Sequence, residues 1–474
     1  MVDRSKNSGY KGLEAFHKYW GKKPVSLWRS MISELSEPDD VVLDPFLGSG
    51  LIARECLDLC RKFIGIDINP MSIELTRLFV EPPAASEFKR TIKKIQSEIE
   101  PLVSKLYGTP GGDIVSHVLW NGDAVEGVWA KKKNKRETLD LTKAEIEALR
   151  SSGEFTSSLM RTPKFFDNAR INARSEMNLN DLFSDRALEI LHSLLQMAND
   201  EKAPHISRAV KLTITAAMGQ MSRMVFAITN KGKVSGKGNG STQIGSWVIG
   251  YWRPKQFFEV NAWNCFANKA SRLVKALEEA EKIGPLLGDE SSKCQLFLHD
   301  SEEKLKDLPA ASIQLVITDP PHGDRIPYLE LSEMWNSVLG YSVDFEKELV
   351  VTNAKGREHI ANSYTTKFES ILKECARVIK PNGYLAVVFN SASVDHWEAL
   401  MRLESVSNLS FIGRFDMNYS AGSVVQDNRD GGLKQDYVMV YSKSNDQAVH
   451  EGARTRMSAF DGWSIDLPEV VKDA

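Results

Sequence analysis

A glycine-rich turn between two short apolar runs constrains the fold more than any other feature of the sequence. The first run is Val41–Asp44, and the turn Asp44-Pro-Phe-Leu-Gly-Ser-Gly50 follows it directly. A helical pattern over residues 51–61 and a second apolar run over residues 63–67 come next. Strand, glycine turn, helix and strand in this order form the first unit of a parallel α/β sheet. The sequence therefore predicts an α/β fold.

The glycine turn also predicts a ligand site. Glycines between a strand and a helix N-terminus let the backbone approach a ligand, and the helix N-terminus favours electronegative groups. No Lys-Ser or Lys-Thr follows the glycines, which argues against a nucleoside triphosphate, and the spacing does not fit G-x-G-x-x-G. Asp67 ends the second run, where a carboxylate accepts hydrogen bonds from both hydroxyls of a ribose. This pattern fits an adenosine-containing cofactor, and a purely structural glycine turn with a capping Asp is the alternative.

A second group of residues, Asp319-Pro320-Pro321-His322, follows the apolar run Ile313–Thr318. Two prolines exclude helix and ladder hydrogen bonds, so they hold a rigid turn at the carboxyl end of a strand. Open α/β sheets bind their ligands at this end. A carboxylate fixed there accepts a hydrogen bond from an exocyclic amino group, and His322 offers a flat face to a base. The alternative is a proline turn in which Asp319 only caps a helix.

A long segment without the strand-helix pattern separates the two groups, and the pattern resumes near Gln295. We therefore predict one α/β domain that is interrupted by an inserted domain. The predicted boundaries are residues 1–100 and 291–445 for the α/β domain, 101–290 for the insertion and 446–474 for a C-terminal tail.

Charge is unevenly distributed along the chain, although the formal net charge is only −3. Residues 202–269 contain ten Lys or Arg, one acidic residue and eight aromatic residues. Basic residues interleaved with aromatics suit a phosphate backbone and stacked bases. A solvated charged face beside ordinary core aromatics is the alternative. The candidate nucleic-acid contacts are Lys231, Lys233, Lys237, Arg253 and Lys255.

Several classes of protein are disfavoured. No apolar run approaches the roughly 20 residues that span a bilayer, and the first residues lack the apolar core of a signal peptide. The five cysteines contain no C-x-x-C pair and the nine histidines no H-x-x-x-H spacing, which argues against disulfides and a metal site. No cysteine follows a proline, which disfavours a cysteine nucleophile of the cytosine-C5 type. We therefore expect a cytoplasmic protein without a metal or a membrane partner.

The two groups together resemble motifs of the amino-methylating DNA methyltransferases. DPFLGSG (residues 44–50) and FIGIDINP (residues 63–70) resemble the motifs that bind S-adenosyl-L-methionine (AdoMet). TDPPHG (residues 318–323) resembles the catalytic motif.

Two further segments carry the same resemblance. HKYWGKKP (residues 17–24) is similar to the segment that closes over the methionine end of AdoMet, and LHDSEEKL (residues 298–305) is similar to a motif near its adenine. The resemblance covers residues 11–80 and 293–445 and has the α-type order of motifs, in which the insertion carries target recognition.

The resemblance implies a Rossmann-like class I AdoMet-dependent methyltransferase fold: a mostly parallel sheet with an antiparallel last strand and a large inserted target-recognition domain. It implies transfer of a methyl group from AdoMet to the exocyclic amine of a base flipped out of duplex DNA. Adenine N6 is favoured over cytosine N4, and the setting is restriction-modification or phage defence. DNA and cognate restriction or defence proteins are the expected partners.

The resemblance also assigns roles residue by residue. Asp319 and the carbonyl of Pro320 hold the amine, next to Pro321. His322, with Tyr328, stacks on the base. Lys22 or Lys23 lies near the carboxylate of AdoMet. The implied AdoMet-binding set is His17, Trp20, Lys22, Lys23, Asp44, Pro45, Phe46, Gly48, Gly50, Asp67, Ile68, Asp300 and Ser301.

The chain departs from the family at one position. His322 stands where the family has Tyr, Phe or Trp, and an imidazole has less stacking area and can become charged. Two alternatives stay open. One is an RNA base N-methyltransferase, which shares both motifs, and the other is a non-catalytic AdoMet-binding DNA sensor.

Overall fold

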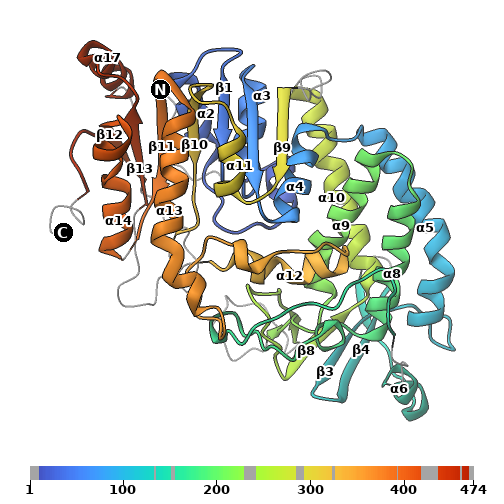
Figure 1. Cartoon of the computed structure of the whole chain (residues 1–474). Coiled ribbons are helices and arrows are strands. Elements are labelled where there is room, and N and C mark those ends of the chain that lie inside the picture. The colour runs from blue at the N-terminus through green and yellow to red at the C-terminus, as the bar shows by residue number, and fades with distance from the viewer. Residues whose placement is uncertain are drawn as a thin grey trace.

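The computed structural model describes residues 10–468 except residues 133–134, 151–154, 229–241, 284–292, 323–325, 392, 418–435 and 459–461. These described residues form a mixed α/β fold (Figure 1). Their largest sheet has eight strands, in the spatial order β14 (Trp463–Ser464), β12 (Ser410–Met417), β13 (Asp436–Ser442), β11 (Ile379–Phe389), β10 (Ile313–Thr318), β1 (Val41–Asp44), β2 (Lys62–Asp67) and β9 (Cys294–Leu298). The five strands from β11 to β9 are parallel, and β13 is antiparallel to both of its neighbours.

Side chains that alternate along each strand belong to apolar cores on the two faces of this sheet. Val42 and Leu315 belong to the core on one face, and their chain neighbours Leu43 and Val316 belong to the core on the other. The first face is covered by α2 (Val25–Leu35), α3 (Leu51–Asp58) and α17 (Gln447–Ser458). The second face is covered by α11 (Ser301–Asp307), α13 (Glu358–Val378), α14 (Val394–Met401) and α15 (Leu403–Ser407). Apolar strands buried on both faces are typical of a parallel sheet between helices.

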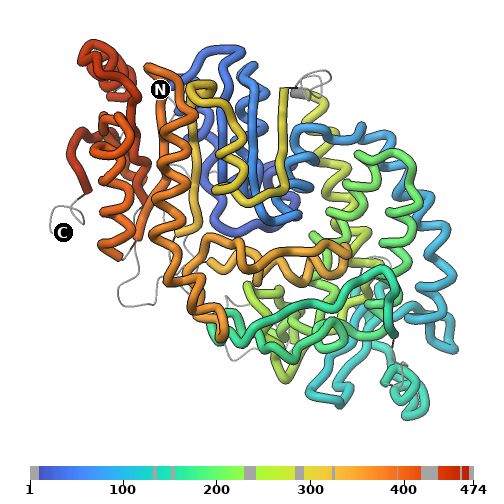
Figure 2. Tube along the Cα trace, viewed as in Figure 1, coloured from blue at the N-terminus to red at the C-terminus, as the bar shows by residue number. Residues whose placement is uncertain are grey.

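The helices between β2 and β9 lie beside the β9 edge of the sheet, and the strands of this part lie below the main sheet (Figure 1 and Figure 2). This part starts with α4 (Pro70–Val80), which the side chain of Asn69 caps by accepting a hydrogen bond from the backbone N–H of Met71. A common apolar core joins α5 (Ala85–Tyr107), α8 (Asp185–Asp200), α9 (Pro204–Met221) and α10 (Ala262–Ile283). A small antiparallel sheet has the order β5 (Lys135–Thr138), β4 (Ala124–Lys132), β3 (Val115–Asn121) and β8 (Gln256–Val260). Shorter elements are α6 (Lys143–Arg150), η1 (Ala169–Ile171), α7 (Leu179–Leu182), β6 (Ala227–Ile228) and β7 (Gln243–Ile244).

One helix, α12 (Tyr328–Val338), joins the two parts of the molecule. Figure 1 shows it running below the carboxyl ends of the main-sheet strands and above β3, β4 and β8. Its residue Trp335 is buried in the core that α5, α8, α9 and α10 share. On the other side, Asn69 donates a hydrogen bond to Ser332 Oγ (2.9 Å) and accepts one from Asn336 (3.2 Å). The helix that follows the end of β10 is therefore fixed to residues from both parts.

Two further elements border the site described below, α1 (Gly12–Phe16) and η3 (Phe345–Lys347). Within the described ranges, no helix is long and apolar enough to cross a membrane. The same ranges contain no group of three or more His, Cys, Asp or Glu side chains that could hold a metal ion.

Candidate active site

An open cavity lies where the carboxyl ends of β1, β2 and β10 meet the N-terminal segment and the start of α12. Its volume, including space open to solvent, is about 900 Å³. The predicted site residues that line it are Trp20, Lys22, Lys23, Asp44, Phe46, Gly48, Asp67, Ile68, Asp300, Ser301, Asp319, Pro321 and Tyr328. The glycine turn and the Asp-Pro-Pro turn, which are far apart in the sequence, therefore open into the same cavity.

Other predicted site residues are absent from the cavity lining; they are His17, Pro45, Gly50, Pro320 and His322. Gly50 has a φ of +76°, and a Cβ there would lie 2.2 Å from Thr76 Oγ1, so this glycine allows α3 to pack against α4. His17 Nε2 lies 2.9 Å from Thr215 Oγ1, and its ring packs edge-on against Trp335. Burial lowers the pKa of His17 to about 3, so this histidine is a neutral packing residue at physiological pH.

Asp67 is held by the backbone of the turn that it faces. Its Oδ2 accepts a hydrogen bond from the N–H of Gly48 and its Oδ1 accepts one from the N–H of Asn69, both at 2.8 Å. These bonds orient the carboxylate at the cavity wall. Burial raises its pKa to about 6, although the hydrogen bonds from the backbone oppose this shift.

Asp44 joins the glycine turn to the Asp-Pro-Pro turn. Its Oδ1 accepts hydrogen bonds from the N–H of Phe46 (3.0 Å) and from the hydroxyl of Thr318 (2.7 Å), the last residue of β10. Only 1% of Asp44 is exposed, and burial raises its pKa to about 7 despite these hydrogen bonds. A cationic group in the cavity would favour the ionised form of this carboxyl.

The segment of residues 17–24 lines the cavity with two aromatic side chains, and each of them stacks on an aromatic residue of α12. Tyr19 stacks on Tyr328 with ring centroids 6.0 Å apart, and Trp20 stacks on Trp335 at 4.8 Å. Gly21 has a φ of +72°, and a Cβ there would lie 2.7 Å from the hydroxyl oxygen of Tyr328. Glycine therefore lets this segment pass close to the first turn of α12.

Lys22 and Lys23 have different partners. Lys22 Nζ donates hydrogen bonds to the carbonyl oxygens of Glu14 (2.7 Å) and His17 (2.9 Å), so it fixes the fold of its own segment. Burial lowers the pKa of Lys22 to about 8. Lys23 is 4% exposed, and its Nζ lies 3.0 Å from Asp319 Oδ2 and 3.4 Å from Asp436 Oδ2. It therefore contacts the carboxylate of the Asp-Pro-Pro turn.

A hydrogen bond from α13 holds the Asp-Pro-Pro turn in place. The hydroxyl of Tyr364 donates a hydrogen bond to the carbonyl of Pro321 at 2.6 Å. Asp319 keeps 19% of its side chain exposed, whereas His322 is 7% exposed and packs edge-on against Phe389 at a centroid distance of 6.0 Å. Asp319 therefore faces the cavity, and the imidazole of His322 lies behind it.

Asp300 is the N-cap residue of α11 and lines the same cavity. Its Oδ1 accepts a hydrogen bond from the N–H of Glu303, and its Oδ2 lies 2.6 Å from Lys367 Nζ. The hydroxyl of the next residue, Ser301, donates to the carbonyl of Pro45. These contacts join α11 and α13 to the glycine turn.

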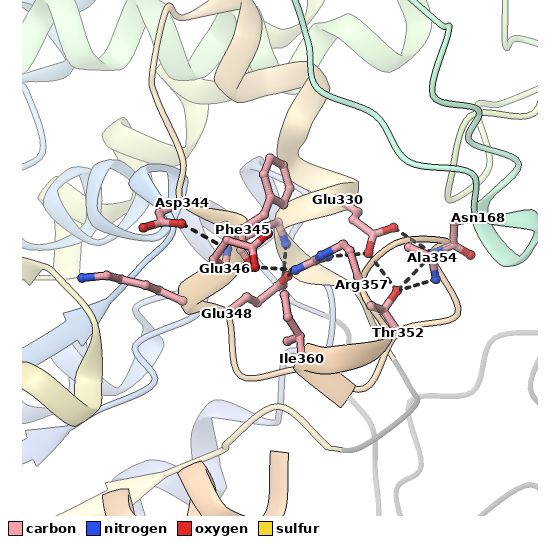
Figure 3. A network of polar contacts seen from close by, with 12 residues as sticks. Asn168, Glu330, Asp344, Phe345, Glu346, Glu348, Thr352, Ala354, Arg357 and Ile360 are labelled. Atoms are coloured by element: carbon pink, nitrogen blue, oxygen red, sulfur yellow. Dashed lines mark hydrogen bonds and ion pairs between the residues drawn. The ribbon is translucent and has the colours of Figure 1, made fainter. Parts of the chain in front are cut away.

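A buried ionic network supports the first turn of α12 (Figure 3). Arg357 is fully buried, and its guanidinium lies 2.6 Å from Glu330 Oε1 and 2.9 Å from Glu348 Oε2. Glu348 also accepts a hydrogen bond from the N–H of Leu329 (2.9 Å), and Glu330 accepts one from Asn168 (2.8 Å). The network connects the cavity wall, α12 and the residues between β2 and β9.

Sequence reasoning missed several residues that line the cavity: Tyr19, Gly21, Trp28, Leu47, Ser49, Leu51, Ile52, Asn69, Leu329, Lys347, Glu348, Leu349, Lys367 and Ile371. Tyr19 and Gly21 lie within the HKYWGKKP segment, so that segment was a signal for both. Glu348 and Lys367 lie outside every motif, and only the fold brings them to the cavity.

The predicted nucleic-acid contacts are only partly described. Three of them, Lys231, Lys233 and Lys237, lie outside the described residues. Arg253 is 40% exposed at its side chain and forms an ion pair with Asp181 at 2.9 Å. Lys255 is exposed, and the nearby Trp252 is 42% exposed.

Comparison with known proteins agrees with the motifs. Residues 2–77 match the family model N6_N4_Mtase, described as DNA methylase. The chain is 35% identical over 102 residues to the Type II methyltransferase M.HpaI of Haemophilus parainfluenzae, which covers 21% of this chain and 31% of that protein. It is 36% identical over 84 residues to the DNA adenine methyltransferase YhdJ of Escherichia coli (strain K12), which covers 17% and 29%.

The match to these curated relatives thus spans less than a third of their length. Among solved structures, the rRNA methyltransferase aviRa from Streptomyces viridochromogenes aligns over 97% of both chains with 11% identity and a TM-score of 0.28. A TM-score this low supports no argument.

The fold and the cavity define a mixed α/β protein with a ligand site at the carboxyl ends of a parallel sheet. The motifs and these partial matches agree with the resemblance of the sequence to the N6/N4 DNA amino-methyltransferases, and the family model itself covers residues 2–77. Methyltransferases of this family use AdoMet as the methyl donor.

The residues of the cavity fit this donor. Asp44 and Asp67 supply carboxylates, and Gly48 exposes its backbone between them. Trp20 Nε1 is buried and has no hydrogen-bond partner among the described residues, although Trp20 lines the cavity. An unpaired buried donor at a cavity wall is expected where a ligand completes the hydrogen bonds.

Proposed function

We propose that this protein transfers a methyl group from AdoMet to the exocyclic amine of a base in DNA, with adenine N6 favoured over cytosine N4. One observation carries the proposal: Asp319 and Pro321 line the same cavity as Asp44, Gly48 and Asp67. A target amine held at Asp319 would therefore share a cavity with the methyl donor. Bringing two reactants together in this way is the main source of catalysis where no covalent enzyme intermediate is needed.

The cavity walls suggest a role for each group. Asp67 and Asp44 would bind the donor, and Asp319 would accept a hydrogen bond from the target amine. When bound, AdoMet supplies an electrophilic methyl group on a sulfonium centre. Tyr328 lines the cavity and His322 does not, so we assign stacking on the flipped base to Tyr328.

The fold supports a Rossmann-like class I methyltransferase domain, with the residues between β2 and β9 as the inserted target-recognition domain. Arg253 and Lys255, on the described part of the insertion, and Lys231, Lys233 and Lys237 are proposed contacts to the DNA backbone. A cytoplasmic protein of restriction-modification or phage defence, with cognate partner proteins, is consistent with this proposal.

The direct test is methyl transfer from tritiated AdoMet to duplex DNA, single-stranded DNA and RNA, with Asp319→Asn as the control. We expect label in duplex DNA only, and digestion to nucleosides to identify N6-methyladenine. Label in RNA alone would favour an RNA methyltransferase. Binding of AdoMet and DNA without transfer would favour a non-catalytic sensor.

A further inference from the structure

The placement of His322 is not explained by stacking on a base. Its side chain is 7% exposed and lies against Phe389. Among the described residues, neither ring nitrogen has a hydrogen-bond partner, although Nε2 lies 3.3 Å from Asp319 Oδ1. A buried polar group without a hydrogen bond costs free energy. The burial of the His322 imidazole beside Asp319 therefore needs an explanation.

The other oxygen of Asp319 faces a fixed cation. Lys23 Nζ lies 3.0 Å from Asp319 Oδ2 and 3.4 Å from Asp436 Oδ2. Burial alone would lower the pKa of Lys23, but the charges of Asp319 and Asp436 outweigh burial and raise it, so Lys23 stays charged. A proton that reached Asp319 would weaken this ion pair. The carboxylate is therefore suited to pass a proton on, and His322 is the neighbouring group that can accept it.

We propose that His322 acts through Asp319, by receiving at Nε2 the proton that the target amine gives up to Asp319 Oδ1. The inference rests on the function proposed above. As the amine nitrogen bonds to the methyl carbon, the carbon–sulfur bond of the donor breaks and its electron pair stays on sulfur. The positive charge then lies on the amine nitrogen, which loses one proton to Asp319 Oδ1. That proton moves to His322 Nε2, and Asp319 regains its ion pair with Lys23.

In this arrangement Asp319 is the catalytic residue and His322 is a positioning residue behind it. The Tyr, Phe or Trp that the family has at this position could not accept a proton. Proton transfer therefore explains why this chain has His322 there. General acid–base assistance of this kind contributes roughly 10²–10⁴-fold to a rate.

Several other titratable groups face this pair. Lys23 and Asp436 lie on the far side of Asp319. Tyr364 contacts the carbonyl of Pro321 and the ring of His396 at a centroid distance of 4.4 Å. The donor site also titrates, because the pKa values of Asp44 and Asp67 are about 7 and 6. The kinetic test therefore uses saturating AdoMet, compares variants of His322 that share all of these groups, and includes a separate variant of His396.

The test is single-turnover methylation of duplex DNA from pH 5.5 to 8.5 by wild type, His322→Phe, His322→Gln and, as a matched control, His396→Gln. We expect the wild-type rate to fall toward acid pH as His322 becomes protonated and can accept no further proton. His322→Phe and His322→Gln should be slower by about 10²-fold at pH 8 and should lack this acid decline. His396→Gln should keep both the rate and its pH dependence.

The substitution His322→Phe separates the two explanations of this residue. It restores the aromatic ring of the family, so stacking on the base predicts equal or faster methylation, whereas proton transfer predicts slower methylation. An active wild type that His322→Phe matches in rate and pH profile would overturn this inference and leave the proposed function intact. A wild type that methylates no DNA would overturn both.

A second measurement needs no turnover. The imidazole signals of His322 can be followed by NMR as a function of pH and assigned by their loss in His322→Gln. In Asp319→Asn the imidazole signals of His322 should shift, because the carboxylate oxygen that lies 3.3 Å from Nε2 is replaced by an amide group. Signals that stay in place would show that the two side chains do not interact.

Discussion

At the scale of single residues, Asp44 makes stability depend on pH. Burial raises its pKa from the usual 3.8 to about 7, so the folded protein holds a proton that the unfolded chain releases. The contribution of Asp44 to the free energy of unfolding is therefore largest below a pH of about 4, and it is lost as the pH rises through 7. Above pH 7 the free energy of unfolding is lower by on the order of 4 kcal/mol, at 1.36 kcal/mol for each pKa unit.

Asp44→Asn removes this cost while it keeps the oxygen that accepts hydrogen bonds from Phe46 and Thr318. We expect the variant without ligand to be more stable than wild type at pH 8, and the difference to shrink toward pH 5.5. The same variant should bind AdoMet more weakly, since a carboxylate favours a cationic ligand. Denaturant unfolding at both pH values and calorimetric titration with AdoMet measure these effects. Equal stability of the two proteins at pH 8 would show that burying the ionised carboxylate of Asp44 costs no free energy.

Asp319 gives a second prediction at this scale. Asp319→Asn should reduce methyl transfer at least 100-fold, because the neutral amide no longer balances charge on the target amine. AdoMet affinity should stay within about threefold of wild type, since Asp44 and Asp67 are the proposed contacts to AdoMet and remain in the cavity lining. Calorimetry and single-turnover methylation separate the two quantities. A parallel collapse of affinity and rate would mean that Asp319 belongs to the donor site.

At the scale of elements, α12 depends on the Arg357 network. A guanidinium that contacts two carboxylates cannot be removed without leaving buried charge, which typically costs roughly 3–5 kcal/mol. We expect Arg357→Met to lower the free energy of unfolding by this order. Arg357→Lys should restore little of it, because an ammonium cannot bridge Glu330 and Glu348 as a planar fork does. Arg253→Ala, which breaks the exposed pair with Asp181, is the control and should cost less than about 1 kcal/mol. Similar losses in all three variants would show that the network adds nothing.

The elements also show what the sequence could predict. The apolar runs at 41–44, 63–67 and 313–318 are confirmed as β1, β2 and β10. Local apolar runs were sufficient there, because these strands are buried on both faces. Residues 380–383, Lys-Pro-Asn-Gly, have a sequence typical of a turn, but β11 begins at Ile379 and continues through them with an irregularity, and Asn382 has a φ of +62°.

The candidate site was predictable only where its residues are local to a motif. Asp44, Gly48 and Asp67 were found because a short stretch of sequence carries them together. The ion pair of Lys23 with Asp319 joins residues almost three hundred positions apart, and no pattern in either segment indicates it. The burial of His322 likewise depends on packing against Phe389 of β11. Such contacts exist only once the sheet has brought these strands together.

At the scale of the whole molecule, the sheet supplies the cavity and the residues between β2 and β9 supply a second body beside it. α12 connects the two, since it contacts the cavity with Tyr328 and the core shared by α5, α8, α9 and α10 with Trp335. Residues 202–269, which lie between β2 and β9, contain ten Lys or Arg and one acidic residue, while the chain as a whole carries a net charge of −3.

This uneven charge leads to the last prediction. Charge reversal at Lys231, Lys233 and Lys237 should weaken DNA binding and reduce its dependence on salt. Each lost phosphate contact removes about 0.9 from the slope of log K against log salt concentration, so three contacts remove about 2.7. Fluorescence anisotropy of labelled duplex DNA from 50 to 300 mM salt would measure this slope. AdoMet affinity should not change, because Asp44 and Asp67, the proposed contacts to AdoMet, are left in place.

A control distinguishes local contacts from a change in net charge. Reversal at Lys89, Lys93 and Lys94, which are exposed on α5, alters net charge by the same amount at another place. If Lys231, Lys233 and Lys237 contact phosphates, only their reversal reduces the slope. Equal slopes for the two triple variants would show that DNA responds to the overall field of the protein, and an unchanged slope in both would assign these lysines to a solvated loop.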